Sequence, residues 1–128
     1  MTLDSSALIA ILFSEHGHLD LIDRILVAES VRVAAPTLVE ASMVLAGRRR
    51  TKAVGEVEAL VQELGVTVLP FGEREWHAAV AAFLRFGRGR HAAALNFGDC
   101  LAYAAAVVAN DSLLFVGVDF GLTDVRAA

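Results

Sequence analysis

The chain has 128 residues, the length of one ordinary domain, and 56% of them are hydrophobic, with a mean hydropathy of +0.58. Such a chain can bury a sizeable core, which excludes an intrinsically disordered protein, and no apolar run reaches the roughly 18 residues that a membrane span needs. The net charge of −4, taken alone, argues against nucleic-acid binding.

Two features of the sequence indicate an intracellular protein. The first residues, MTLDSSALIAILF, contain no basic segment and place Asp4 ahead of the apolar stretch, so we expect no signal peptide. The single cysteine, Cys100, cannot form a disulfide within the chain, which fits a reducing compartment. We expect it to pack as a small hydrophobic residue. The sequence therefore predicts a cytoplasmic protein that does not associate with membranes.

Short strands and helices alternate through the first half of the chain. A very short strand ends at Asp4, and Ser5 or Ser6 can cap the helix that follows. HLDLIDRILVAE has leucine and isoleucine at helical spacing. VRVAAP alternates and is β-branched, which predicts a strand, and Pro36 marks the next helix start. The expected elements are strands over 2–3 and 31–36 and helices over 5–12, 18–29, 37–50 and 54–65.

The second half continues the alternation. VTVLPF reads as a strand that ends at Pro70, and a helix with a strongly apolar face follows. The glycine-rich segment RGRHAAALNFG predicts a loop, and Asp99 opens the next helix. SLLFVGV is fully apolar, as in a buried parallel strand, and a turn and tail follow. The expected elements are strands over 66–71 and 112–118, a helix over 73–87, a loop over 88–98 and a helix from Asp99. This alternation predicts an α/β sandwich with a mainly parallel sheet.

Four acidic residues are predicted to converge on one edge of this sheet. Functional groups gather at the carboxyl ends of parallel strands. Asp4 and Asp119 each follow a strand directly, Glu40 lies one turn into the helix after the second strand, and Asp99 opens the helix after the glycine-rich loop. Residues far apart in the sequence are therefore expected to meet at one site.

Each of these acids also has a purely structural explanation. Asp4 can be a helix N-cap, and Thr37 with Glu40 matches the spacing of a capping box. Asp99 can be a first-turn acid favoured by the helix dipole, and Asp119 can be a turn residue. Both explanations stay open for each residue taken singly. Their shared place at one sheet edge, flanked by apolar residues, favours a common site.

A cluster of carboxylates has a chemical use. Neighbouring carboxylates repel one another, so burial together raises a pKa unless a cation is bound. Mg²⁺ and Mn²⁺ prefer oxygen ligands and can activate a water molecule and clamp a phosphate for in-line attack. Without the four acids, the 15 acidic residues fall to about 11, equal to the 11 basic residues. That balance is compatible with a polyanionic substrate.

The basic residues are concentrated rather than spread. Seven of the eleven fall in two short segments. Such clusters are either solvated helix ends or a phosphate-binding surface, and both explanations stay open. The residues are Arg48, Arg49, Arg50 and Lys52 in the first segment, and Arg85, Arg88 and Arg90, beside His91, in the second.

Four segments resemble a known family. They are LDSSALIAIL at 3–12, APTLVEASMVL at 35–45, GRGRHAAALNFGDCLAYAAA at 87–106 and LLFVGVDFGLTD at 113–124. They resemble the PIN-domain family of metal-dependent ribonucleases, and most closely the VapC toxins of bacterial type II toxin–antitoxin modules. The segments occur in this order and are spread along nearly the whole chain. The resemblance implies one PIN domain over 1–128, with a three-layer α/β/α sandwich and a mainly parallel sheet.

The resemblance also implies an acidic Mg²⁺ or Mn²⁺ site that hydrolyses RNA phosphodiester bonds. Asp4 and Asp99 would be the principal metal ligands, and Glu40 and Asp119 would complete the cluster. The supporting residues would be Ser6, Asn96, Thr123 and Asp124, and the RNA-binding residues Arg48, Arg49, Arg50, Arg88 and Arg90. The chain departs from the family pattern twice, with Ser5 where threonine is common and Val118 where a polar residue is common.

The implied partners are RNA, a second copy of the chain and a small cognate antitoxin. VapC toxins form homodimers, and antitoxins assemble these into heterotetramers or larger complexes. The resemblance implies the same for this chain. The antitoxin's C-terminal segment wraps the toxin and can place a basic side chain in the acidic site. Segments 19–29 and 54–64 can form such a groove or can equally face the core. The alternative function is a PIN-like module that binds RNA or an antitoxin without hydrolysis, against which the intact set of four acids argues.

Overall fold

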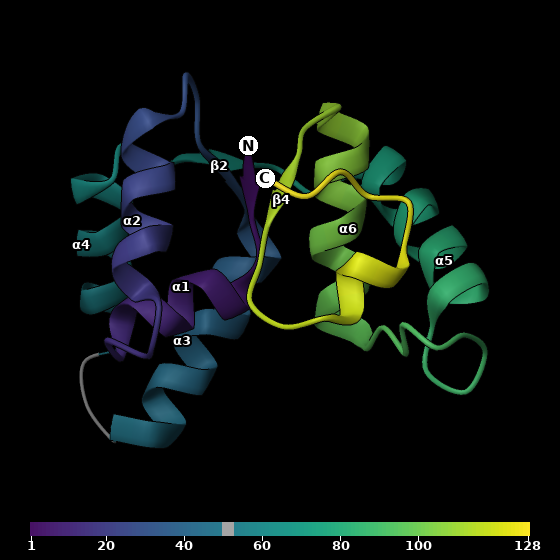
Figure 1. Ribbon diagram of the computed structural model, residues 1–128, viewed down its shortest axis with the longest axis horizontal. Coiled ribbons are helices and arrows are strands. Elements are labelled where there is room, and N and C mark those ends of the chain that lie inside the picture. The colour runs from purple at the N-terminus through teal and green to yellow at the C-terminus, as the bar shows by residue number, and fades with distance from the viewer. Residues whose placement is uncertain (50–52) are drawn as a thin grey trace.

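Four short parallel strands form the centre of the molecule, in the order β3-β2-β1-β4 (Figure 1). The computed structural model describes residues 1–49 and 53–128. The parallel α/β arrangement predicted from the sequence is confirmed. The strands are β1 (Thr2–Leu3), β2 (Arg32–Ala34), β3 (Thr67–Leu69) and β4 (Leu113–Leu114).

Helices cover both faces of the sheet, and their grouping follows the chain (Figure 1). The first four lie on one side, and the last two lie on the other. α6 contacts β1, β2 and β4, and α5 packs on the outer side of α6. A short 3-10 helix, η1, follows β4. The helices are α1 (Ser5–Leu12), α2 (His18–Val27), α3 (Ala35–Arg49), α4 (Ala53–Glu63), α5 (Glu73–Phe86), α6 (Phe97–Ala109) and η1 (Asp119–Leu122).

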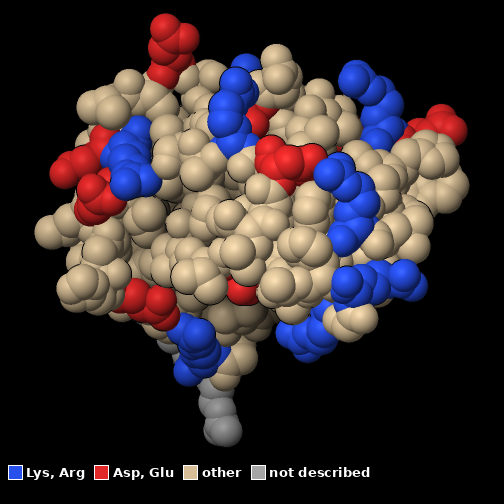
Figure 2. All heavy atoms as spheres, turned by 45° about the vertical axis from the view of Figure 1, so that its right-hand side comes forward, with Lys and Arg blue, Asp and Glu red and all other residues tan. Residues whose placement is uncertain are grey.

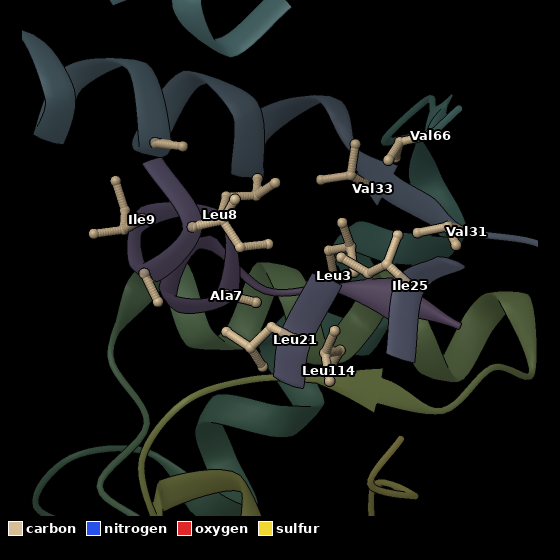
Figure 3. Packing of buried hydrophobic residues seen from close by; sticks show 13 residues of the cluster. Leu3, Ala7, Leu8, Ile9, Leu21, Ile25, Val31, Val33, Val66 and Leu114 are labelled. Atoms are coloured by element: carbon tan, nitrogen blue, oxygen red, sulfur yellow. The ribbon is translucent and has the colours of Figure 1, made fainter. Parts of the chain in front are cut away.

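The main core lies between the sheet and the first group of helices. Leu3 and Val33, from the two central strands, are fully buried, as is Leu8 of α1. Figure 3 shows these side chains together with Ile25 and Leu114. Full burial of each large aliphatic side chain contributes about 1.5–3 kcal/mol. This core fixes β1, and therefore fixes the position at which Asp4 leaves the sheet.

The last strand is shorter than the sequence predicts. A strand over 112–118 was expected from its apolarity, but β4 ends at Leu114. The amide of Val116 then donates to the Ser6 hydroxyl at 2.9 Å instead of joining a strand. Gly117 has a φ of +109°, which L residues rarely adopt. The prediction was wrong because these apolar residues belong to an exposed loop, not to the core.

One helix begins where it was predicted, and two begin earlier than predicted. Asp4 is the N-cap of α1, so neither Ser5 nor Ser6 is. α3 begins at Ala35, and the buried Thr37 hydroxyl has no hydrogen-bond partner, so the capping box that was one explanation for Glu40 does not form. α6 begins two residues before Asp99. In the part of the chain that the structure describes, no helix is both long and apolar enough to cross a membrane.

Candidate active site

Asp4 is the most deeply buried of the four acids, with 3% of its surface exposed. Its Oδ2 accepts hydrogen bonds from the Ser6 amide at 2.9 Å and the Ser6 hydroxyl at 2.5 Å. Its Oδ1 is buried without any hydrogen-bond partner. Burial raises the pKa of Asp4, the Ser6 hydrogen bonds lower it, and the charge of Asp99 raises it further. One oxygen is therefore anchored while the other is available for a ligand.

Ser6 connects two parts of the site. Its hydroxyl donates to Asp4 and accepts from the Val116 amide in the loop that leads to Asp119. Ser6, which was predicted to support the site, makes both of these hydrogen bonds. It links the end of β1 to the loop after β4.

Asp99 is the third residue of α6 and takes part in a reciprocal capping box with Asn96. Its Oδ2 accepts from the Asn96 amide at 2.7 Å, and its own amide donates to the Asn96 Oδ1 at 2.9 Å. Burial raises the pKa of Asp99, Asn96 lowers it, the charge of Asp119 raises it, and Arg88 lowers it. Asp99 therefore does help to cap α6, but this role uses only one of its carboxylate oxygens and fixes the direction of the other.

Glu40 lies on α3 and reaches the first turn of α6. A Cβ atom placed on Gly98 would lie 2.4 Å from Oε2 of Glu40. Burial raises the pKa of Glu40 most, the charges of Asp4 and Asp99 add to the rise, and the nearby Ser5 side chain lowers it. Gly98 was not predicted as a site residue. The sequence did carry a signal, namely a glycine in the first turn of a helix. Glycine lowers helix stability, so its presence there indicates a close contact that leaves no room for a side chain.

Asp119 begins η1, and its own side chain is exposed. It lies close enough to Asp99 to raise the pKa of that residue. Phe120 buries its ring beneath η1, and the Thr123 hydroxyl donates to the Phe120 carbonyl at 2.7 Å. Thr123 therefore stabilises the end of η1. Asp124 is engaged elsewhere, because its two oxygens contact Tyr103 and Arg85.

The structure brings the four predicted acids into one electrostatic neighbourhood. The charge of Asp99 raises the pKa of Asp4 and of Glu40, the charge of Asp4 also raises that of Glu40, and the charge of Asp119 raises that of Asp99. Among the residues that the structure describes, no three histidine, cysteine or carboxylate side chains already form a set that could hold a metal ion. The carboxylates are near neighbours rather than a preformed ligand set. An all-oxygen donor set with an unpartnered buried Oδ1 still fits a hard divalent cation.

The predicted basic residues occupy different surroundings. Arg88 is exposed and close enough to Asp99 to lower its pKa. The Arg90 guanidinium lies over the Phe83 ring at 5.3 Å. Arg48 forms a 3.0 Å ion pair with Glu15. Figure 2 shows arginine side chains spread over one face, with more of them around its right half and mostly uncharged residues between them. The side chain of Arg49 and the whole of Arg50 and Lys52 lie outside the described residues.

The fold and the acidic neighbourhood at the sheet edge define a class of protein. Residues 1–125 match the model of the PIN domain, and the chain belongs to this family. Among curated relatives, Ribonuclease VapC36 of Mycobacterium tuberculosis is 42% identical over 127 residues, which cover 98% of this chain and 91% of that protein. Ribonuclease VapC28 of the same organism is 40% identical over 129 residues, which cover 100% of this chain and 97% of that protein.

Solved structures have the same fold. VapC20 of M. tuberculosis, a sarcin–ricin-loop-cleaving toxin, superposes with a TM-score of 0.73 at 18% identity, covering 98% of both chains. VapBC2 from Rickettsia felis, bound to a DNA fragment from its promoter, gives a TM-score of 0.77 at 8% identity, covering 99% of this chain and 96% of that chain.

Proposed function

We propose that this protein is a metal-dependent endoribonuclease that acts as the toxin of a type II toxin–antitoxin module. One observation carries the proposal: an unpartnered carboxylate oxygen of Asp4 is buried within a neighbourhood of acids whose pKa values are raised. The similarity to VapC ribonucleases over almost the whole chain supports RNA as the substrate. We place its action in the cytoplasm, as expected for an enzyme that acts on cellular RNA.

Asp4 and Asp99 would hold a Mg²⁺ or Mn²⁺ ion, with Glu40 and Asp119 completing the negative charge around it. When bound, the ion supplies Lewis-acid activation of water and stabilises negative charge on the phosphate oxygens. The residues of the chain supply the geometry. Ser6 holds one oxygen of Asp4, and Asn96 holds one oxygen of Asp99, so the second oxygen of each is directed into the site.

The second group of basic residues would bind the RNA backbone. Arg88 and Arg90 project from the loop between α5 and α6, directly before the helix that carries Asp99. A guanidinium binds phosphate oxygens with good geometry, and binding of this kind weakens as the salt concentration rises. Arg48 is paired with Glu15 and is the weaker candidate.

The proposal is tested by incubating the purified protein with RNA in EDTA, Mg²⁺ or Mn²⁺, alongside the Asp99→Asn variant. Asparagine can still accept the Asn96 hydrogen bond, so the variant should fold like the wild type. Cleavage that needs the metal and is lost in the variant supports the proposal. A variant that cleaves as fast as the wild type contradicts it, and RNA binding without metal-dependent cleavage would identify a binding module instead.

An antitoxin segment would occupy the apolar groove between α3 and α4. The groove has a volume of about 710 Å³ and includes the exposed side chains of Val39 and Met43. Of the two segments considered for such a groove, 54–64 lines it and 19–29 does not. Val39 lines the groove and precedes Glu40 on α3, so an antitoxin segment that continues past this end of the groove would carry a basic side chain toward the acids. Met43→Glu should weaken binding of a cognate antitoxin and leave RNA cleavage unchanged.

A second copy of the chain would pack on the outer face of α5. Trp76, Val80 and Phe83 form an exposed apolar stripe there, and Phe97 of α6 is 81% exposed beside it. Exposed patches of this kind mark interaction surfaces. The first turn of α5 is acidic and the last is basic, so two copies of α5 packed antiparallel bring opposite charges together. Val80→Asp should convert a dimer to a monomer in light scattering.

A further inference from the structure

The segment that carries Asp119 pairs with the sheet at its two ends. β4 ends at Leu114, and the chain returns where the Leu113 amide donates to the Arg126 carbonyl at 2.7 Å. Between these points, η1 rests on the buried Phe120, while residues 116–119 are exposed. The position of Asp119 therefore depends on side chains that hold this segment to the rest of the molecule.

Asp124 provides such a contact shortly before Arg126, where the segment returns to the sheet. The Tyr103 hydroxyl donates to its Oδ1 at 2.5 Å, and the Arg85 guanidinium lies 2.9 Å from its Oδ2. Tyr103 is only 6% exposed and comes from α6, while Arg85 comes from the last turn of α5. Both oxygens of Asp124 are thus held by the two helices on this side of the sheet, and hydrogen bonds to a charged carboxylate are stronger than neutral ones.

Tyr103 and Asp99 lie one turn apart on α6, so they project from the same side of that helix. Asp124 and Asp119 lie five residues apart on the opposing segment. The contact between Tyr103 and Asp124 therefore joins the two elements that carry Asp99 and Asp119, close to the acids themselves.

A force acts against this arrangement. Asp99 and Asp119 carry like charges, and each destabilises the ionised form of a neighbour. The Val116 amide holds the start of the loop to the Ser6 hydroxyl, but residues 117–119 are exposed, so this part of the loop can relieve the repulsion by moving outward.

We propose that Asp124, held by Tyr103 and Arg85, is a positioning residue that keeps Asp119 facing Asp99 against their mutual repulsion. The inference rests on the proposed carboxylate metal site and adds three residues that do not touch the metal or the RNA. Partners of this kind, which orient the residues that bind a metal, typically change metal affinity by about 10–100-fold when removed.

Three variants separate positioning from general stability. Asp124→Ala removes both contacts. Asp124→Asn keeps an amide oxygen that can accept from Tyr103 but loses the charge that pairs with Arg85. Tyr103→Phe removes only the hydroxyl and leaves the ring packed near Phe86. Arg32→Gln is the matched control, because it breaks a 2.8 Å ion pair with Asp111 at the opposite end of the sheet.

Two measurements on each protein decide the question. Mn²⁺ affinity is measured by calorimetry without RNA, and amide hydrogen exchange is measured for residues 116–123 in the metal-free protein. We expect Asp124→Ala to bind Mn²⁺ about tenfold more weakly and to exchange faster in this segment. Tyr103→Phe should show the same weaker Mn²⁺ binding and faster exchange as Asp124→Ala. Asp124→Asn should keep most of the wild-type affinity. Arg32→Gln should change neither the affinity nor the exchange, although it lowers the Tm.

The inference would be overturned if Asp124→Ala bound Mn²⁺ and exchanged like the wild type. It would also be overturned if Arg32→Gln lost as much Mn²⁺ affinity and protection from exchange as Asp124→Ala. If the wild type itself binds no Mn²⁺, the proposed function fails. The exchange rates of residues 116–123 then decide alone whether Asp124 holds the segment.

Discussion

Replacing Gly98 with alanine is expected to separate stability from activity. The added Cβ atom would lie 2.4 Å from Oε2 and 2.6 Å from Cδ of Glu40. Since non-bonded carbon contacts favour about 3.5 Å, the carboxylate must withdraw by about 1 Å. The atoms in the way are the end of a flexible side chain, so the backbone of α6 does not need to move.

The free energy of unfolding should therefore not fall. Alanine is favoured over glycine in a helix by up to about 1 kcal/mol, and withdrawal of Glu40 relieves its repulsion with Asp4 and Asp99. We expect the Tm to stay the same or rise by a few degrees. In contrast, a displacement of about 1 Å in a catalytic group can lower the rate by about 100-fold.

The assay compares RNA cleavage and thermal unfolding of Gly98→Ala with those of Gly55→Ala. Gly55 lies on α4, where an added Cβ atom would meet nothing within 4 Å, so the same chemical change should leave cleavage intact. A Gly98→Ala, Glu40→Gln double variant should lose little more than either single variant, because both changes act through Glu40. Full activity in Gly98→Ala, or additive losses in the double variant, would refute the reasoning.

Three further predictions follow from the charges. Asp4→Asn should stabilise the protein without divalent metal by on the order of 1–3 kcal/mol, because it removes a buried charge whose Oδ1 has no partner; a fall in Tm would contradict this. The pKa of Asp4 is raised above 3.8 in the folded state, so the folded protein holds a proton that the unfolded chain has released, and stability falls as the pH rises through this range. The Tm of Asp4→Asn in EDTA should therefore exceed that of the wild type increasingly from about pH 4 toward neutrality, and a constant difference would argue against ionisation of Asp4. Arg88→Ala should weaken RNA binding and reduce the dependence of log affinity on log salt by about 1, whereas Arg48→Ala, which breaks an existing ion pair, should change RNA binding less.

The meeting of the four acids could be predicted because it follows from topology. Once Asp4 and Asp119 are placed after parallel strands, the sheet brings them to the same edge whatever the details of packing. The helix starts are less certain from sequence, because several polar residues near a boundary can serve as the cap. Asp4 rather than Ser5 caps α1, and Asn96 pairs with Asp99 at the start of α6.

What the sequence did not predict depends on contacts between distant segments. The role of Gly98 becomes visible only when Glu40, from another helix, is placed against it. The partners of Asp124 come from α5 and α6, which no local pattern connects to the tail. The early end of β4 has the same origin, since Val116 bonds to Ser6 instead of continuing the strand.

The central claim is that the Asp4 and Asp99 carboxylates hold the metal ion on which RNA cleavage depends. The most direct measurement titrates Mn²⁺ into the wild type and into Asp4→Asn, and follows RNA cleavage at the same Mn²⁺ concentrations. We predict that wild-type cleavage rises with metal occupancy and that Asp4→Asn, although folded, loses both binding and cleavage. A folded Asp4→Asn variant that binds Mn²⁺ and cleaves RNA like the wild type would contradict the account.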